Sequence, residues 1–263
     1  MYTMKKLESW EQFEERFNSY IANNLSQKKD FSPYFRGQCD AGWPLQTTLE
    51  RYSPNKNYSS EEYYKILETI KPEIEAHTSK KWKLPEFSKK EALDPPSPTV
   101  YGFMVYCRHH GIPSPLLDWS KSPYVASYFA FAKAEEKKNV SIYVFMPTFI
   151  EIRDNYYADI FALGPRVNSN TERHDNQQSV YTLCLKLDDE VDGEDVFYAK
   201  YTDACRNLQL SGELIKYTIP GKEKNKVLRK LDSMNINEYS LFKSEDGLIS
   251  TLDYRHIFLR SLP

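Results

Sequence analysis

Residues 109–132 restrict the fold of this chain more than any other stretch, because a polar, proline-rich half leads directly into a largely apolar half. In the second half, Ser122 can cap the first free N–H groups of a helix, and Pro123 suits the first helical position. Good helix formers follow as far as Ala132, and apolar residues fall on every side of the predicted helix. We therefore expect a helix that is buried at the centre of the molecule.

The first half of this stretch is a loop, punctuated by glycine and proline, that runs into the N-terminus of the predicted helix. Exposed N–H groups and the helix dipole favour an anion at such a place. The polar side chains that the loop offers to a ligand are those of His109, His110, Asp118, Ser120 and Ser122. Two interpretations follow: a ligand site, or a rigid turn in which serine and aspartate only satisfy caps.

The charge and the cysteines exclude several classes of site. The formal net charge of −2 and the pI near 6.3 give no basic footprint for nucleic-acid binding by bulk electrostatics, which leaves only a local patch. The cysteines, Cys39, Cys107, Cys184 and Cys205, lie far apart and include no pair at metal-ligand spacing. We expect reduced thiols, no disulfide framework and no metal.

The N-terminal residues lead into a polar helix rather than an apolar run, and no stretch approaches the roughly 20 apolar residues that span a bilayer. We expect a cytoplasmic protein without membrane contact. Leu7, Trp10 and Phe13 recur at helical spacing. Residues 1–29 are therefore predicted to form an amphipathic helix that packs on a core domain of residues 30–263.

Arg36 is a candidate ligand-binding residue on a short predicted strand over residues 31–38. The alternation of a strand places Tyr34 and Arg36 on one face and Phe35 on the other. A guanidinium fixed in this way can bind a phosphate or carboxylate through two N–H groups, and Gly37 would let a ligand approach the backbone. An ordinary surface ion pair is the alternative role of Arg36.

The rest of the chain favours an α+β fold. Runs rich in β-branched and aromatic residues predict strands at 140–146, 179–185, 196–201 and 214–220. Helices are predicted over 59–74, 99–108, 222–231 and 247–259. Because strands follow one another without regular βαβ alternation, we predict a mixed, mostly antiparallel sheet of at least five strands with helices packed on it.

A second polar group precedes the strand predicted at 179–185. It covers residues 172–178 and includes Arg173, Gln177 and Gln178. Polar groups at the end of a strand frequently form binding sites, because a rigid sheet positions the loop that carries them. An ordinary solvated loop is the alternative interpretation.

Three segments together resemble the FRG domain, a bacterial and phage family named for its Phe-Arg-Gly motif. They are Tyr34–Gln38, which contains Phe35-Arg36-Gly37, the block His110–Ser120, and Arg173–Tyr181. Further matches at 217–220 and 241–242 extend the resemblance from residue 30 to residue 260. The predicted core domain is therefore identified as a member of this family.

The resemblance implies an ADP-ribosyltransferase-like fold that binds NAD or a related nucleotide. Arg36 would hold the phosphates or ribose, the polar loop and helix would cradle the nicotinamide, and Gln178 would stand where a glutamate usually polarises the ribose. The residues that the resemblance assigns to catalysis are Arg36, His110, Asp118 and Gln178. Those assigned to cofactor binding are Arg36, Gly37, Ser120, Ser122, Tyr128, Arg173 and Gln177.

Gln178 leaves the function open between two classes. A glutamine can hydrogen-bond to a ribose hydroxyl, but it cannot act as a base or stabilise a cation by charge. The first hypothesis is an ADP-ribosyltransferase-like effector of the toxin or phage-defence kind. The second is a non-catalytic module that binds a nucleotide, nucleic acid or protein in the same cleft. A nuclease that uses His109 or His110 ranks last, because spacing identifies no second acid–base partner.

Overall fold

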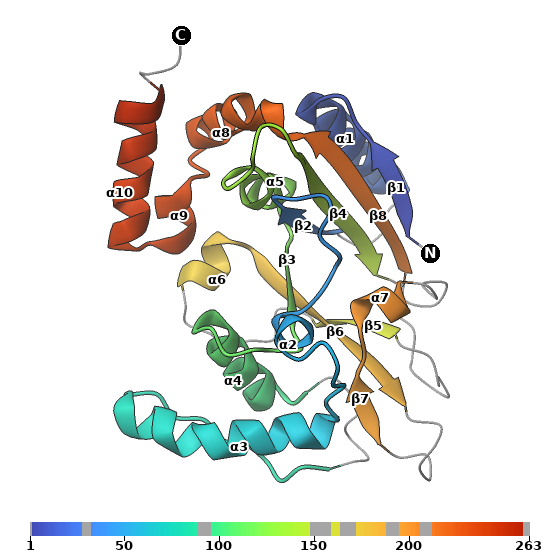
Figure 1. Cartoon of the computed structure of the whole chain (residues 1–263), viewed down its shortest axis with the longest axis vertical. Coiled ribbons are helices and arrows are strands. Elements are labelled where there is room, and N and C mark those ends of the chain that lie inside the picture. The colour runs from blue at the N-terminus through green and yellow to red at the C-terminus, as the bar shows by residue number, and fades with distance from the viewer. Residues whose placement is uncertain are drawn as a thin grey trace.

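The computed structural model describes residues 2–27, 33–88, 96–147, 159–163, 172–187, 195–205 and 212–259 (Figure 1). The strands are β1 (Thr3–Lys6), β2 (Tyr34–Gln38), β3 (Leu117–Ser120), β4 (Asn139–Pro147), β5 (Asp159–Leu163), β6 (Ser179–Leu187), β7 (Val196–Tyr198) and β8 (Gly212–Pro220). The first helices are α1 (Trp10–Gln27), α2 (Thr48–Tyr52), α3 (Ser60–His77), α4 (Pro98–His109), α5 (Pro123–Phe131) and α6 (Glu172–Asn176). They are followed by α7 (Tyr201–Ala204), the 3-10 turn η2 (Gly221–Glu223), α8 (Lys224–Ser233), α9 (Glu238–Phe242), α10 (Glu245–Asp253) and the π-helical turn η3 (Tyr254–Phe258).

The eight strands form one sheet in the order β1-β8-β4-β2-β3-β6-β5, with β7 also paired to β6. β1 and β8 are parallel. The other neighbours run antiparallel. The predicted α+β class and the mixed, mostly antiparallel sheet are therefore confirmed.

The sheet is weakest between β2 and β3, which are joined by a single register pair, Phe35 with Ser120. β2 pairs with β4 along its whole length, and β3 does the same with β6. In Figure 1, β1, β8 and β4 lie in the upper part of the molecule, and β6 and β7 lie in the lower part. Strands that are joined at one point separate beyond it, so Arg36 and Asp118 lie beside an opening in the sheet.

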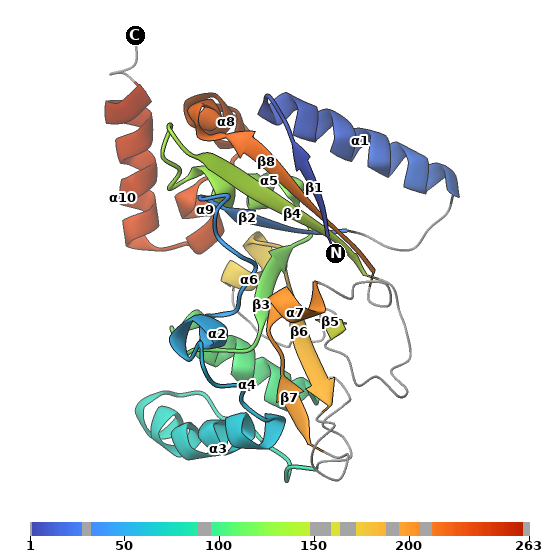
Figure 2. The ribbon, with the colours of Figure 1, turned by 45° about the vertical axis from the view of Figure 1, so that its right-hand side comes forward.

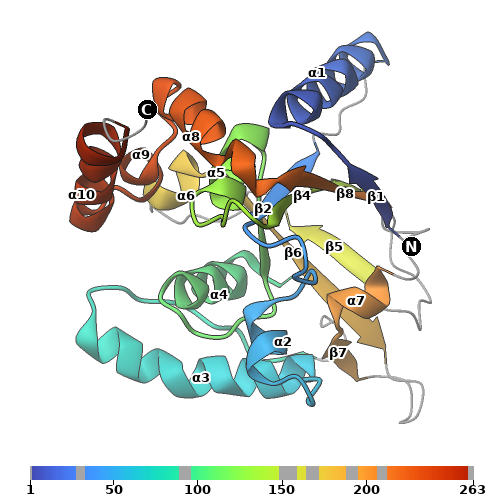
Figure 3. The same cartoon turned by 45° about the horizontal axis from the view of Figure 1, so that its top comes forward.

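Helix α5 is buried against the upper strands, as the sequence predicted. Its N-terminus is capped by Ser122, whose Oγ accepts a hydrogen bond from Val125 N at 3.2 Å, and Pro123 occupies the first turn. Phe131 and its neighbours pack in one core with residues of α1, α8, β4 and β8. Figure 3 shows α5 and α8 together on the same side of these strands.

Gly37 allows α5 to lie directly on β2. A Cβ at this position would stand 1.9 Å from Ala126 O and 2.5 Å from Ala130 N, both backbone atoms of α5. The side of Gly37 on which a Cβ would stand is thus filled by a helix. The physical reason is that a strand and a helix can approach this closely only where a side chain is missing.

The lower strands are covered by α3 and α4 (Figure 2). Ser59 and Glu62 form the predicted capping box at the start of α3, and the helix continues through Pro72. Tyr63 and Phe103 pack with Leu183 of β6 in a separate core. This core fixes the end of α4, which carries two residues of the candidate site.

The N-terminal segment contributes a strand as well as the expected helix. β1 pairs with β8 from Thr3 to Lys6. Trp10 of α1 is buried, and its Nε1 donates a hydrogen bond to Ser127 Oγ of α5 at 2.9 Å. The segment before residue 30 therefore shares the sheet and the core of the following residues.

The predicted strands correspond to β2, β4, β6, β7 and β8, and the predicted helices to α1, α3, α4, α5, α8 and α10 with η3. β1, β3 and β5 were not predicted. Leu117–Ser120 was expected to belong to a loop and is strand β3 instead, because its backbone pairs with β6. This pairing could not be read from a four-residue segment flanked by proline and serine.

None of the four cysteines forms a disulfide bond. Across the residues described, no group of three or more His, Cys, Asp or Glu side chains is arranged to hold a metal ion. Within the same residues, no helix combines the length and the apolar character that crossing a membrane requires.

Candidate functional site

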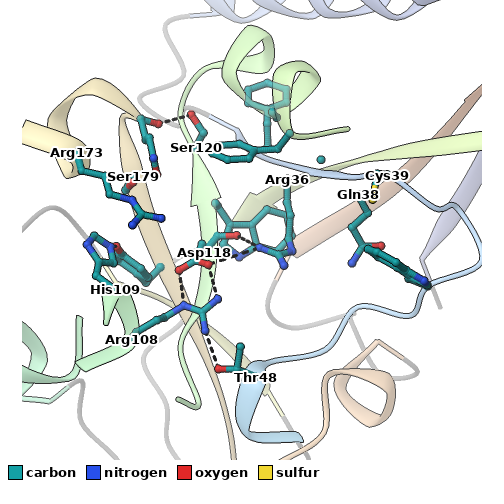
Figure 4. Close-up of a pocket in the computed structure, with 18 of the residues that line it drawn as sticks. Arg36, Gln38, Cys39, Thr48, Arg108, His109, Asp118, Ser120, Arg173 and Ser179 are labelled. Carbon is teal, nitrogen blue, oxygen red and sulfur yellow. Dashed lines mark hydrogen bonds and ion pairs between the residues drawn. The ribbon is translucent and has the colours of Figure 1, made fainter. Parts of the chain in front are cut away.

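A cavity of about 440 Å³ opens where β2 and β3 separate (Figure 4). We call it the arginine cavity. Strands β2, β3 and β6 form its floor, and the ends of α2, α4, α5 and α6 surround it. Its lining residues are Phe35, Arg36, Gly37, Gln38, Cys39, Trp43, Thr48, Arg51, Arg108, His109, Asp118, Trp119, Ser120, Ala126, Phe129, Arg173, Gln177, Ser179 and Tyr181.

Arg36 points from β2 into this cavity, and its side chain is 17% exposed. Its Nη1 donates to the backbone oxygen of Asp118 at 2.7 Å and lies 3.9 Å from the carboxylate. Its buried Nε has no hydrogen-bond partner. Burial, with smaller effects from Arg108 and Arg51, lowers the pKa of Arg36 to about 10 against the opposing charge of Asp118. The guanidinium is therefore still charged at neutral pH.

Arg108 and Asp118 form the strongest ion pair of the site. Nε and Nη2 of Arg108 donate to the two carboxylate oxygens of Asp118, and Nη1 donates to Thr48 Oγ1 at 2.8 Å. Burial alone would raise the pKa of Asp118, but the charge and hydrogen bonds of Arg108, and then the charge of Arg36, hold it below its ordinary value. Asp118 is therefore an ionised carboxylate that fixes two arginines.

Two further arginines reach the same cavity. Arg51 of α2 is exposed at its edge, and Arg173 lies opposite on α6. The buried Nε of Arg173 has no hydrogen-bond partner, and its guanidinium lies 4.7 Å from the ring centre of Phe242. Among the described residues that line the cavity, Asp118 is the sole carboxylate beside four arginines. The cavity therefore carries a net positive charge, although the chain as a whole is slightly negative.

His109 lies on the floor of the cavity as an uncharged imidazole. Its Nε2 and the hydroxyl of Tyr181 form a hydrogen bond of 2.7 Å. Burial, and then the charge of Arg173, lowers the pKa of His109 to about 4. Burial also raises the pKa of Tyr181 far above its ordinary value. At neutral pH this pair therefore adds no charge to the site.

Ser120 and Gln177 join the walls of the cavity to each other. Ser120 Oγ donates to the backbone oxygen of Gln177 at 2.7 Å and accepts from Ser122 N at 3.0 Å. The side-chain amide of Gln177 donates to Leu241 O at 3.2 Å. These hydrogen bonds connect the end of α6 to β3 and to α9. They therefore fix the position of the segment that contains Arg173.

Six of the predicted site residues line the arginine cavity: Arg36, Gly37, Asp118, Ser120, Arg173 and Gln177. Their roles in binding or catalysis stay predictions. Asp118 was expected beside Ser122 or His110, where it would order the loop through backbone N–H groups. It instead faces Arg108 and Arg36, because β3 turns its side chain toward the opening of the sheet.

The other four predicted residues lie outside the cavity. Ser122 is buried and uses its hydroxyl to cap α5. Tyr128 is buried in the core between α5 and the neighbouring helices. His110 is the C-cap of α4, with its ring 4.4 Å from that of Tyr106.

Gln178 was expected to face the cavity, but its side chain does not. It has a positive φ of 47°, its side chain is exposed, and its backbone oxygen accepts from Lys121 N at 3.0 Å. This left-handed turn directs Gln177 and Ser179, the residues on either side, to the cavity. A turn of this kind has no strong signal in a pair of glutamines.

Sequence reasoning missed Thr48, Arg51 and Arg108. It named His109 among the polar side chains of the loop and as a candidate for a nuclease, but did not assign it to catalysis or cofactor binding. Arg108 and His109 had one usable signal, which is that they close a helix whose other positions are almost all apolar. A charged residue on such a helix must meet a partner or a ligand. Thr48 and Arg51 had none, because the turn that brings α2 to β3 is set by tertiary contacts.

Comparison with protein families identifies an FRG domain over residues 32–139. The match contains every lining residue of the arginine cavity except Arg173, Gln177, Ser179 and Tyr181. Neither the curated proteins nor the solved structures gave a match.

Proposed function

We propose that this chain, which carries an FRG domain, binds a nucleotide in the arginine cavity through its phosphate groups, and that NAD is such a nucleotide. One observation carries the proposal: Arg36 and Arg173 line a cavity with a net positive charge, and the buried Nε of each has no hydrogen-bond partner. A buried charged donor without a partner is costly, and an anion between the two arginines would remove that cost.

The arrangement suits a phosphate better than a simple carboxylate. A guanidinium presents a planar pair of N–H groups that match two phosphate oxygens. Four arginines with one opposing carboxylate leave more positive charge than a monoanion needs. A diphosphate offers several oxygens in a short span, so it can contact guanidinium groups on both sides of the opening.

Cleavage of the bound nucleotide is the second candidate function, and the state of Asp118 bears on it. Transfer of ADP-ribose needs negative charge beside the ribose as the bond to nicotinamide breaks. Asp118 is the carboxylate of the described cavity, but Arg108 binds both of its oxygens. We therefore rank NAD binding ahead of an ADP-ribosyltransferase-like activity. The ADP-ribosyltransferase-like fold belongs to this second candidate, and a role as an effector depends on the activity.

Isothermal titration calorimetry with inorganic pyrophosphate, ADP and NAD tests the proposal. In Arg36→Met and Arg173→Met the aliphatic bulk is kept and the charge is lost, and each variant should bind all three compounds at least about tenfold more weakly. Arg229→Met, an exposed position of α8 outside the cavity, is the matched control and should bind as the unmodified protein does. Absence of binding to the unmodified protein at millimolar concentration would overturn the proposal.

Chromatography of NAD after incubation with the protein separates the two candidate functions. Binding without release of nicotinamide is expected. Nicotinamide release that is lost in Asp118→Asn would make the chain an NAD-cleaving enzyme with Asp118 in the catalytic role.

A further inference from the structure

A second cavity of about 500 Å³ lies next to the arginine cavity, between α5 and the C-terminal helices α8, α9 and α10. We call it the ring cavity. Cys39 and Phe129 line both cavities, so the two cavities adjoin at these residues. In Figures 1 and 3, α9 and α10 stand on the side of the molecule away from α1, and α8 lies between them and α1.

The two cavities have opposite chemical character. The ring cavity is lined mainly by aromatic and aliphatic side chains, which include Tyr128, Phe129, Leu228, Ile236, Phe242 and Tyr254. Its charged residues are Asp232, Glu238 and Lys133, and Asp232 forms an ion pair of 2.8 Å with Arg255. The hydroxyl of Tyr254 is buried and has no hydrogen-bond partner. The ring cavity therefore lacks the excess of positive charge that the arginine cavity has, and it favours a flat, uncharged or cationic group that can form hydrogen bonds.

Phe129, which lines both cavities, is linked to one of the arginines through Phe242. The rings of Phe129 and Phe242 meet edge to face with their centres 6.0 Å apart. Arg173 lies over the other ring of this pair, 4.7 Å from the centre of Phe242. A ligand whose phosphates contact Arg173 thus has aromatic surface within reach on the side of the ring cavity.

We infer that the ring cavity holds the aromatic base of the nucleotide whose phosphates lie in the arginine cavity, and that this base carries an exocyclic N–H donor. The inference rests on the proposed function and names the part of the ligand that distinguishes a nucleotide from a bare diphosphate. Stacking on aromatic side chains stabilises a base irrespective of its identity. Glu238 Oε2 accepts a hydrogen bond from Ser250 Oγ, and a carboxylate has the capacity to accept another from an amine or amide on the ring.

The test compares pyrophosphate with ADP and NAD on variants of the ring cavity alone. Ala132→Leu fills part of the cavity at the end of α5. Glu238→Gln removes the charge and keeps the size of the side chain, while Glu245→Gln makes the same change on α10 outside both cavities. Circular dichroism confirms that each variant is folded before titration.

The inference predicts that Ala132→Leu weakens ADP and NAD by at least about tenfold and leaves pyrophosphate within about twofold. Glu238→Gln should weaken the nucleotides by about threefold or more, and Glu245→Gln should leave every affinity unchanged. If pyrophosphate and the nucleotides bind with equal affinity, and Ala132→Leu changes neither affinity, the ring cavity is not part of the binding site. The proposal for the arginine cavity would then still hold. If none of the compounds binds the unmodified protein, the proposed function fails and the inference fails with it.

Discussion

Arg108, near the C-terminus of α4, binds both carboxylate oxygens of Asp118, which lies ten residues further on in β3, so this helix and this strand are fixed to each other at the cavity. The same guanidinium holds Thr48 at the start of α2. One arginine therefore joins α4 and β3 to α2, which the sequence does not show to be their neighbour. The pair also brings Asp118 within 3.9 Å of Arg36 on β2.

Removal of the charge of Asp118 should destabilise the fold and strengthen the binding of anions. Asp118→Asn leaves two buried guanidinium groups without their counter-ion, but the Asp118 side chain is 41% exposed, so water replaces part of the lost interaction. We expect the free energy of unfolding in urea to fall by about 1–2 kcal/mol. The affinity for pyrophosphate, measured by calorimetry, should rise because the cavity loses its one described carboxylate.

Glu61→Gln is the control for this prediction. Glu61 forms an exposed ion pair with Lys65 on α3, 2.6 Å apart, and such a pair contributes only about 0.3–0.5 kcal/mol. If Asp118→Asn lowers the free energy of unfolding no more than Glu61→Gln does, the ion pair of Arg108 and Asp118 is an ordinary surface contact.

The fold could be predicted where one local signal was strong. Ser122 and Pro123 marked the start of α5, and long runs of β-branched and aromatic residues marked β4, β6 and β8. β1 and β3 have four residues each and are strands only because β8 and β6 pair with them. A segment this short contains too little pattern for its pairing to be read from the sequence.

The candidate site was predicted in part for the same reason. Arg36 and Asp118 stand in conspicuous motifs, but the partner that places Asp118 is Arg108, at the end of a different element. Gln178 was selected because it begins a strand by position, whereas its positive φ turns its side chain to solvent. Contacts between elements and the conformation of a single residue are both set by tertiary structure.

Gly37→Ala should destabilise the protein strongly, because the added Cβ would meet backbone atoms of α5 at 1.9 and 2.5 Å. Backbone atoms cannot rotate away as a side chain can, so α5 would have to leave β2. We expect a loss of about 3 kcal/mol or failure to fold, measured by thermal and urea unfolding. Gly42→Ala is the matched control, because its nearest neighbour would be a side-chain oxygen of Asp40 at 3.1 Å. Equal stability of the two variants would contradict the close packing of α5 on β2.

The protein should tolerate replacement of Gln178, and glycine at this position should make the fold more stable. A non-glycine residue at a φ of 47° is strained, so Gln178→Gly should raise the free energy of unfolding by about 0.5 kcal/mol. Asn235→Gly, at a φ of 58°, should gain less because asparagine adopts this region more easily. Gln178→Glu should leave NAD affinity and NAD hydrolysis as they are in the unmodified protein. A rise in hydrolysis would mean that the side chain reaches the bound ribose.

Acid should destabilise the fold through the protonation of His109. The pKa of His109 is lowered to about 4 in the fold and lies near 6.5 in an unfolded chain, so the unfolded state binds the proton more readily. The contribution of His109 to stability is therefore complete above pH 6.5 and is lost as the pH falls toward 4. Between pH 7 and pH 4.5, the unmodified protein should lose about 2 kcal/mol more free energy of unfolding than His109→Asn, measured in urea. His110→Asn, at the exposed next position, should follow the unmodified protein. If the free energy of unfolding falls equally in all three proteins, the fold does not lower the pKa of His109. The description of His109 and Tyr181 as an uncharged pair would then be wrong.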